Sequence, residues 1–142
     1  MRVEEVMSEA ECCHAGDSIR DAARLMKEEN VGFVPICNAN EEAIGALTDR
    51  DIAIRVVADG RSPDEPVETA MTRDVIACRI GDDLKDAERL MRDHRTSRVM
   101  ICDEGGKLRG VISLQDVAEG ESEHAVGETV RDVKSDQPPA MH

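Results

Sequence analysis

The sequence carries one pattern twice, and this duplication restricts the possible folds more than any other feature. Shifting the chain by 65 positions places Cys13 on Cys78 and Gly45 on Gly110, in a register without gaps. Because internal repeats define an architecture before single elements do, we expect two copies of one structural unit rather than two unrelated segments. Identical pairs in this register also include Asp17 and Asp82, Ala22 and Ala87, Leu25 and Leu90, Ile36 and Ile101, and Asp51 and Asp116.

Both copies predict the element order β-α-β-β-α, and hence an α/β (α+β) fold of two repeats packed with pseudo-twofold symmetry. N-cap residues at 17–18 and 82–83 precede amphipathic helices. The first strand should lie parallel to the second, which should pair with the third as a hairpin. The strands are expected at 11–13, 31–37 and 43–47 in the first copy and at 75–78, 98–102 and 108–112 in the second, and the last helix of the first copy at 51–58.

The repeat also predicts the domain boundaries. Residues 1–58 form the first repeat, 59–66 a linker that contains Gly and Pro, and 67–119 the second repeat. Residues 120–142 begin with Gly120 and have no partner in the repeat, so we expect a partly disordered tail. A unit of about 60 residues covers its own apolar surface poorly, which is why the two copies should pack together.

Charge and composition exclude several classes of protein. The formal net charge of -13 over 142 residues opposes binding to nucleic acid. Phe33 is the only aromatic residue, so no base-stacking platform can form. No apolar run approaches the roughly 18 residues that span a bilayer, and the acidic N-terminus lacks a signal-peptide pattern. We therefore expect a cytoplasmic protein that binds neither nucleic acid nor membrane.

Each copy ends in a signature of the form Gly-apolar-apolar-Thr/Ser-x-x-Asp, at residues 45–51 and 110–116. With residues 34–36 before the first signature and Met7 and Met71 near the start of each copy, the sequence resembles the tandem cystathionine β-synthase (CBS) domain pair, also called a Bateman module. The resemblance extends from Val3 to about Ala118. It is similar to the stand-alone bacterial form, which implies a regulatory protein without an attached enzyme.

The resemblance implies that an adenosine nucleotide (AMP, ADP or ATP, with or without Mg²⁺) binds in one or two clefts between the repeats. A carboxylate can accept hydrogen bonds from both ribose hydroxyls, so Asp51 and Asp116 are the ribose candidates. Thr48 and Ser113 stand where strand gives way to helix, close to an expected phosphate. Because Thr/Ser-x-x-Asp also caps helices, capping alone is the alternative for all four residues.

The two expected clefts are not equivalent. Family members often carry a cation before the middle strand, and Arg98 supplies it in the second copy, whereas the first copy has Gly32 and Phe33. Arg50 is a second candidate for the phosphate, or else a solvated side chain. The resemblance places the adenine near the first strands, at Val75, Ile76 and Ala77 for one cleft and at Cys12 and Cys13 for the other.

The cysteines are duplicated as well. Cys13 and Cys37 recur as Cys78 and Cys102, on strands that we expect to be adjacent and parallel. A strand spacing of about 4.8 Å is compatible with a disulfide. The pairs are either redox-labile disulfides or, as a reducing compartment favours, small buried apolar side chains. We expect no metal site at residues 12–14, because three adjacent residues cannot all face one ion.

Two other functions stay open beside nucleotide binding: a redox sensor that acts through the cysteine pairs, and a purely structural interaction module. An enzyme is not expected, because the histidines lie too far apart in the sequence to assemble a nucleophile and its base. Members of the family often form homodimers, and we expect one here. The apolar surface for it would come from Ile52, Ile54, Val56 and Val57.

Overall fold

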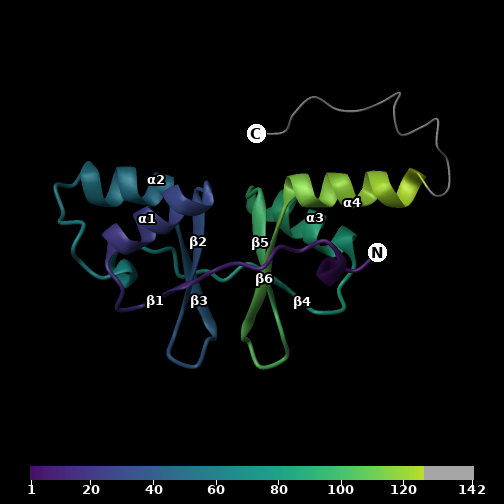
Figure 1. Cartoon of the computed structure of the whole chain (residues 1–142), viewed down its shortest axis with the longest axis horizontal. Coiled ribbons are helices and arrows are strands. Elements are labelled where there is room, and N and C mark those ends of the chain that lie inside the picture. The colour runs from purple at the N-terminus through teal and green to yellow at the C-terminus, as the bar shows by residue number, and fades with distance from the viewer. Residues whose placement is uncertain (127–142) are drawn as a thin grey trace. The chain divides into compact units, whose positions relative to one another are not determined.

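The computed structural model describes residues 1–126, with side chains up to residue 122. These residues form two compact units, each with a three-stranded sheet and its own helices (Figure 1), so the predicted fold of two α+β repeats is confirmed. No helix in the described part of the chain is long and apolar enough to cross a bilayer. The first-copy unit comprises Ala10–Val75 and Gly105–Leu108, and the second-copy unit comprises Met1–Glu9, Ile76–Glu104 and the described residues from 109 to 126.

The sheet of the first-copy unit has the order β1-β2-β3, as the repeat predicts. β1 runs parallel to β2, and β2 and β3 form an antiparallel hairpin. Parallel neighbours require a crossover connection, which α1 provides. The elements are β1 (Cys13–His14), α1 (Ile19–Glu29), β2 (Phe33–Cys37), β3 (Ala43–Thr48), α2 (Asp49–Asp51), its π-helical continuation η2 (Ile52–Val57) and the short 3-10 helix η3 (Val67–Thr69).

The apolar face of α1 closes the core of this unit. Ser18 begins the helix as its N-cap, because its hydroxyl accepts a hydrogen bond from the Asp21 N–H at 3.0 Å. Ile19, Ala22 and Met26 follow at three- and four-residue spacing and are buried on one face. The strands, η2 and the segment after the linker contribute the buried residues Cys13, Val34, Ile36, Leu47, Val56, Val67, Ala70 and Met71.

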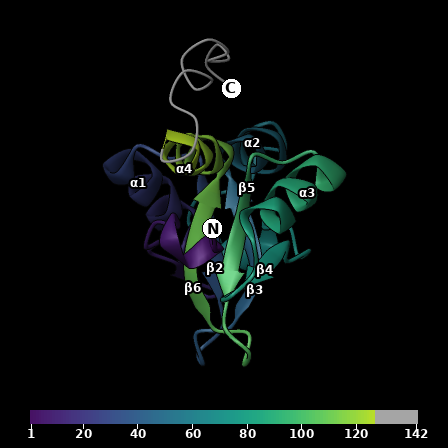
Figure 2. The same cartoon turned by 90° about the vertical axis from the view of Figure 1, so that its right-hand side faces the viewer.

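The second-copy unit repeats this plan, with the sheet order β4-β5-β6 and β4 parallel to β5. Figure 2 shows β5 and β6 side by side, with α3 along the sheet. Asp83 caps α3, whose buried residues Leu84, Ala87 and Met91 have the spacing seen in α1. The elements are η1 (Val3–Glu5), β4 (Ala77–Arg79), α3 (Leu84–His94), β5 (Arg98–Cys102), β6 (Leu108–Ser113) and α4 (Leu114–Val126).

The signature glycines explain how each unit binds the segment that leads into the other repeat. In the second-copy unit, Ser8 exchanges two backbone hydrogen bonds with Val111, at 2.9 and 3.0 Å. A Cβ added at Gly110 would lie 2.7 Å from the Ser8 carbonyl oxygen, so only glycine permits this approach. The first-copy unit has the same arrangement at Thr72, Ala46 and Gly45, with hydrogen bonds of 2.9 and 2.8 Å and a Cβ distance of 2.5 Å.

Helix α4 is longer than the sequence predicts. Gly120, where we expect the tail to begin, is buried within the helix, and an added Cβ would lie 2.8 Å from Val6 and 3.3 Å from Leu84. The glycine therefore permits close packing of α4 in its unit instead of ending it. Residues 120–126, assigned to the tail from the sequence, are helical. The rest of the predicted tail lies outside the described residues.

Candidate functional site

Both signatures form the same hydrogen-bonded box at the start of a helix. The Ser113 N–H donates to Asp116 Oδ2 at 2.9 Å, and the Asp116 N–H donates to Ser113 Oγ at 3.0 Å. Thr48 and Asp51 form the same two bonds, at 2.9 and 3.0 Å. Capping is therefore one role of all four residues. Each hydroxyl can still donate its own proton and each carboxylate has a second oxygen, so capping is compatible with ligand binding.

The second carboxylate oxygen has different surroundings in the two units. Asp51 Oδ1 lies 3.8 Å from Arg55 Nε, and the Asp51 side chain is only 13% exposed. The repeat register places Gly120 where Arg55 stands. Among the described residues, no cation forms an ion pair with Asp116. Asp116 is therefore the better placed of the two carboxylates to accept hydrogen bonds from a ligand.

Arg98, the predicted phosphate cation, opens β5 beside the start of α4. The Leu114 N–H donates to the Ser97 carbonyl oxygen at 2.8 Å, which brings the beginning of β5 and the end of β6 together. Arg98 is half-buried, and its guanidinium forms no ion pair with any side chain of residues 1–122. A guanidinium without an ionic partner beside a helix start is suited to bind an anion.

The first-copy unit has no cation at the corresponding place in its sheet. Phe33 stands there, opposite Thr48 in the β2–β3 register. The Asp49 N–H donates to the Gly32 carbonyl oxygen at 3.0 Å, so strand and helix are connected as in the second-copy unit. Arg50 is exposed, and in the part of the chain that the structure describes its guanidinium has no carboxylate partner. Arg50 is thus the remaining candidate cation of this unit.

The adenine candidates Ile76 and Ala77 flank the beginning of β5 from the side opposite to β6. The Met100 N–H donates to the Ile76 carbonyl oxygen at 3.0 Å, and Ala77 pairs with Met100 in the parallel register. Val75 is 39% exposed and belongs to the first-copy unit. One end of the β4-β5-β6 sheet therefore carries Ile76, Ala77, Arg98, Ser113 and Asp116.

The predicted cysteine pairs lie on adjacent parallel strands, but the two cysteines of a pair project from opposite faces. The register pairs Cys13 with Ile36, and both belong to the core of the first-copy unit. Because side chains alternate along a strand, Cys37 projects from the other face. In this register Cys13 and Cys37 do not face each other, and the cysteines of the described residues are thiols, not disulfides. The second copy has the same register: Cys78 is opposite Ile101, and Cys102 projects from the other face.

Burial, with a smaller effect of nearby carboxylates, raises the pKa of Cys13 to about 11. The same causes raise the pKa of Cys78 to about 11. Both thiols are therefore protonated at neutral pH and behave as small apolar side chains. The alternative of buried structural cysteines fits these positions.

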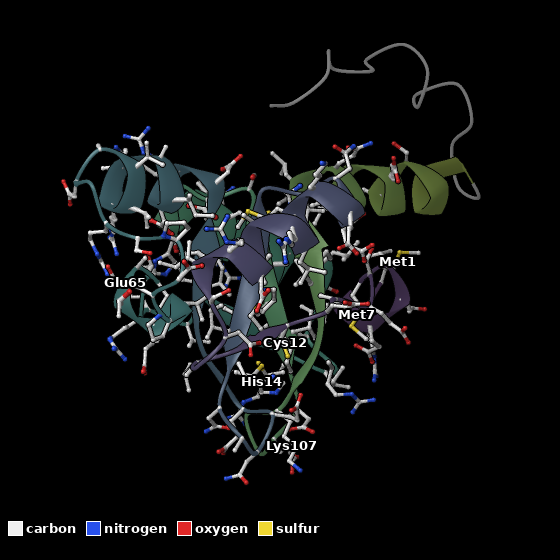
Figure 3. The ribbon with its side chains drawn as sticks, turned by 60° about the vertical axis from the view of Figure 1, so that its left-hand side comes forward. Met1, Met7, Cys12, His14, Glu65 and Lys107 are labelled. Carbon is white, nitrogen blue, oxygen red and sulfur yellow. The ribbon has the colours of Figure 1, made fainter. Side chains whose placement is uncertain are left out.

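One group of side chains was missed in the sequence. Cys12 Sγ lies 3.7 Å from Glu41 Oε2, and His14 Nε2 lies 2.5 Å from Glu41 Oε1. Cys12 and His14 come from the region of β1 (Figure 3), and Glu41 comes from the turn between β2 and β3. From the sequence we treat residues 12–14 as adjacent positions and do not include Glu41. The predicted hairpin of β2 and β3 is the signal for Glu41, because its turn lies beside the end of β1.

The hydrogen bond between His14 and Glu41 changes the protonation of both groups. It raises the pKa of His14 above its ordinary value of 6.5 and lowers the pKa of Glu41 below 4.5. Burial raises the pKa of the Cys12 thiol. The group thus combines a thiol, an imidazole and a carboxylate, three side chains that ligate metals once the thiol and the imidazole are deprotonated.

Comparison with known proteins identifies the family. The family model of the CBS domain matches the chain twice, over residues 3–58 and 66–123. The CBS domain-containing protein YhcV of Bacillus subtilis is 39% identical over 103 residues, which cover 71% of this chain and 71% of the relative. Hypoxic response protein 1 of Mycobacterium tuberculosis is 30% identical over 125 residues, or 87% of each chain. A third relative, MK0525 of Methanopyrus kandleri, is 36% identical, and the match spans 52% of its length.

Solved structures have the same architecture. The crystal structure of Hypoxic Response Protein I, which contains two coordinated zinc ions, has a TM-score of 0.78 at 25% identity and covers 84% of this chain and 98% of that chain. CBSX2, solved in complex with AMP, has a TM-score of 0.76 at 22% identity and covers 87% of this chain and 98% of that chain. The chain therefore belongs to the CBS domain family and carries the domain as a tandem pair.

Proposed function

We propose that the protein is a cytoplasmic regulatory module that binds an adenosine nucleotide, AMP, ADP or ATP, and has no catalytic activity of its own. The observation that carries the proposal is the group of residues at the beginning of β5. It combines a half-buried guanidinium at Arg98, a hydroxyl at Ser113 and a carboxylate at Asp116. The complex of CBSX2 with AMP, in a protein of the same fold, supports this class of ligand.

Each of these groups matches one part of a nucleotide. Arg98 pairs with the phosphate, since a planar guanidinium binds phosphate oxygens through two hydrogen bonds. The Ser113 hydroxyl and the N-terminal N–H groups of α4 add donors to the same phosphate. Asp116 accepts hydrogen bonds from the ribose hydroxyls through the carboxylate oxygen that the helix cap does not use. The peptide groups and apolar side chains at Ile76 and Ala77 receive the adenine.

The first-copy unit is the weaker nucleotide site in this proposal. Its carboxylate, Asp51, already lies near Arg55, and Phe33 occupies the position of the strand cation. A ligand there would have to compete with Arg55 and use the exposed Arg50 for its phosphate. We therefore expect one tighter site per chain, formed around Arg98.

Thermal melting of the 142-residue chain tests the proposal. AMP, ADP, ATP with and without Mg²⁺, the guanine nucleotides and adenosyl compounds would each be added at millimolar concentration. We expect an adenine nucleotide to raise Tm, because a ligand at 100 times its Kd stabilises the folded state by about 2.7 kcal/mol. The guanine nucleotides should have little effect. If no adenine nucleotide shifts Tm, the proposal fails and the structural interaction module becomes the better explanation.

Substitutions assign the shift to the proposed residues. Arg98→Gln should abolish most of the nucleotide-induced shift, measured against the variant's own Tm. Asp116→Asn should reduce it as well, while the remaining amide oxygen still accepts the Ser113 N–H and preserves the cap. Arg92→Gln is the matched control, because Arg92 is an exposed arginine on α3. A full shift in Arg98→Gln would refute the phosphate contact.

We also propose a homodimer that uses the apolar surface of η2. Val56 is 2% exposed and belongs to the core, whereas Ile54 is 48% and Val57 71% exposed. Two exposed large apolar side chains on one short helix favour association with a second copy. Light scattering should give the mass of a dimer, and Val57→Asp with Ile54→Asp should give a monomer. A monomer in the unmodified protein would refute this part of the proposal.

A further inference from the structure

Cys12, His14 and Glu41 bring three metal-ligating atoms together in the first-copy unit. The Cys12 sulfur, a His14 ring nitrogen and a Glu41 carboxylate oxygen all lie within 4.8 Å of one another. We propose that these three side chains bind a divalent transition metal ion of the zinc class. The proposal replaces the expectation that this region has no metal site, and it does not depend on nucleotide binding in the second-copy unit.

Two of the ligands project to the same side because side chains alternate along an extended chain. Cys12 and His14 both contact Glu41, whereas Cys13 between them is buried in the core with Ile36. Figure 3 shows Cys12 and His14 close together. Three consecutive residues indeed cannot face one ion, but two alternate residues and a third from a neighbouring turn can.

The turn between β2 and β3 fixes the third ligand. The Glu41 N–H donates to the Asn38 carbonyl oxygen at 3.0 Å. The side-chain oxygen of Asn38 accepts from the N–H groups of Asn40 and Glu42, at 2.9 and 3.0 Å. The Leu108 N–H donates to the Glu41 carbonyl oxygen at 3.0 Å. The backbone that carries the carboxylate is therefore held in place without a metal, as a preorganised site requires.

The second copy shows that the fold does not require these three residues. At the corresponding positions it has Ala77, Arg79 and Gly106. Gly106 has a φ of 82° and Glu41 a φ of 64°, so both turns need the left-handed region. This region suits glycine and is unfavourable for a residue with a side chain. A glutamate where the other copy uses glycine therefore indicates a role for the side chain and not for the turn.

The donor set determines the class of metal. Thiolate and imidazole ligands favour Zn²⁺ and related ions, whereas Mg²⁺ and Ca²⁺ take oxygen ligands. On binding, the Cys12 thiol releases its proton to solvent, and so does the imidazole of His14 when it is protonated. The side chains of His14 and Glu41 are 45% and 56% exposed, so water can reach the fourth position of a tetrahedral ion.

An ordinary surface ion pair between His14 and Glu41 is the competing explanation. An ion pair between His14 and Glu41 alone would make no use of the Cys12 sulfur, although this sulfur lies 3.7 Å from Glu41 Oε2. Participation of the Cys12 thiolate therefore separates the two explanations. Co²⁺ is a suitable probe, because it accepts the same ligands as Zn²⁺ and a bound thiolate gives it a sulfur-to-metal charge-transfer absorption.

The test is a Co²⁺ titration of the 142-residue chain, stripped of metal and kept reduced, followed by displacement with Zn²⁺. We expect one equivalent of Co²⁺ per chain with the charge-transfer absorption. Cys12→Ala, His14→Ala and Glu41→Gly should each weaken Zn²⁺ binding by more than about 10-fold, the lower limit for losing even an outer-shell partner. Glu41→Gly should fold normally, because it introduces the residue that the second copy has in the same turn conformation.

His94→Ala is the matched control, since His94 is an exposed histidine at the end of α3. It should leave Zn²⁺ affinity unchanged. The proposal is overturned if the charge-transfer absorption does not appear, or if Cys12→Ala binds Zn²⁺ as tightly as the unmodified chain. An equal loss of affinity in His94→Ala and His14→Ala would overturn it as well.

Discussion

The first-copy and second-copy units have the same strand order and the same hydrogen-bonded box at a helix start, yet their polar side chains differ. A duplicated fold is its own control, because a residue that one copy lacks is not needed for the fold. The differences that concern the two proposed sites are Phe33 against Arg98, Arg55 against Gly120, Cys12 against Ala77, His14 against Arg79, and Glu41 against Gly106.

These differences separate the two proposed sites. The second-copy unit has the strand cation and a carboxylate without a cationic partner in the described residues, which favours a nucleotide there. The first-copy unit has a carboxylate paired with Arg55, and near β1 a group of metal-ligating side chains. The two copies thus share one framework but carry different polar side chains at the two proposed sites.

Substitution of the signature glycines Gly45 and Gly110 should have the largest effect on stability, because both copies depend on them in the same way. Alanine at Gly45 or Gly110 would place its Cβ 2.5 or 2.7 Å from a backbone oxygen, so the paired segment must move. We expect each substitution to lower the free energy of unfolding by about 3 kcal/mol, as for severe overpacking. Gly16→Ala is the control, because an added Cβ there meets nothing within 4 Å. Urea denaturation measures all three, and a large loss at only one signature would break the comparison.

The framework was predictable from sequence because the repeat constrains it twice. A short apolar run alone does not distinguish a strand from a buried helix. The run 98–102 and its partner around Ile36 occur in the same register between the same helix and turn, and both form strands. The parallel pairing of β1 with β2 follows from the crossover that α1 makes. The structure departs from the prediction where the copies diverge, as in α4, which continues past Gly120 because this glycine permits close packing.

The candidate sites were less predictable, because they depend on which face a side chain projects from. Cys13 and Cys37 lie on adjacent strands, but the register places Cys13 opposite Ile36, so Cys37 projects from the other face. A shift of one residue in register reverses this outcome, and no sequence pattern fixes it. Glu41 was missed for a related reason: its approach to Cys12 and His14 depends on the conformation of one turn.

The two core cysteines should react alike, since both copies bury them. With the pKa of Cys13 and Cys78 at about 11 instead of 9.0, each thiol has about 100-fold less thiolate at pH 8. We expect iodoacetamide to label both at least about 100-fold more slowly than in the unfolded chain. Cys12, which is half-buried, should be labelled first. Mass spectrometry of digested samples measures the rates, and rapid labelling of only one core cysteine would show that the two cores differ.

The helix-start aspartates should differ by a smaller amount. Asp51→Asn and Asp116→Asn both keep an oxygen for the cap, but only Asp51 lies near a cation, Arg55 at 3.8 Å. Because Arg55 is 49% exposed, solvent screens this pair. We expect Asp51→Asn to cost about 0.5 kcal/mol more than Asp116→Asn. In an Arg55→Ala background the two substitutions should cost the same, and a persistent difference would assign the effect to something other than this pair.

The smallest expected difference between the two copies is their contribution to the pH dependence of stability in the metal-stripped protein. The hydrogen bond to Glu41 raises the pKa of His14 above 6.5, so this histidine adds stability that is complete below about pH 6.5 and is lost as pH rises through the raised value. The same bond lowers the pKa of Glu41 below 4.5, so the glutamate adds stability that is complete above about pH 4.5 and is lost as pH falls. The pair therefore stabilises the fold most between these two limits.

Neighbouring charges act in the same direction, because Asp17 also raises the pKa of His14 and Lys107 also lowers the pKa of Glu41. Glu41→Gly leaves His14 without its partner and should flatten the dependence of Tm on pH between 5.5 and 8. Since the pair is exposed, 1 M salt should weaken the same dependence in the unmodified protein. The second copy has Arg79 and Gly106 at these positions and cannot contribute such a term. An unchanged pH profile in Glu41→Gly would show that the dependence originates outside the first-copy turn.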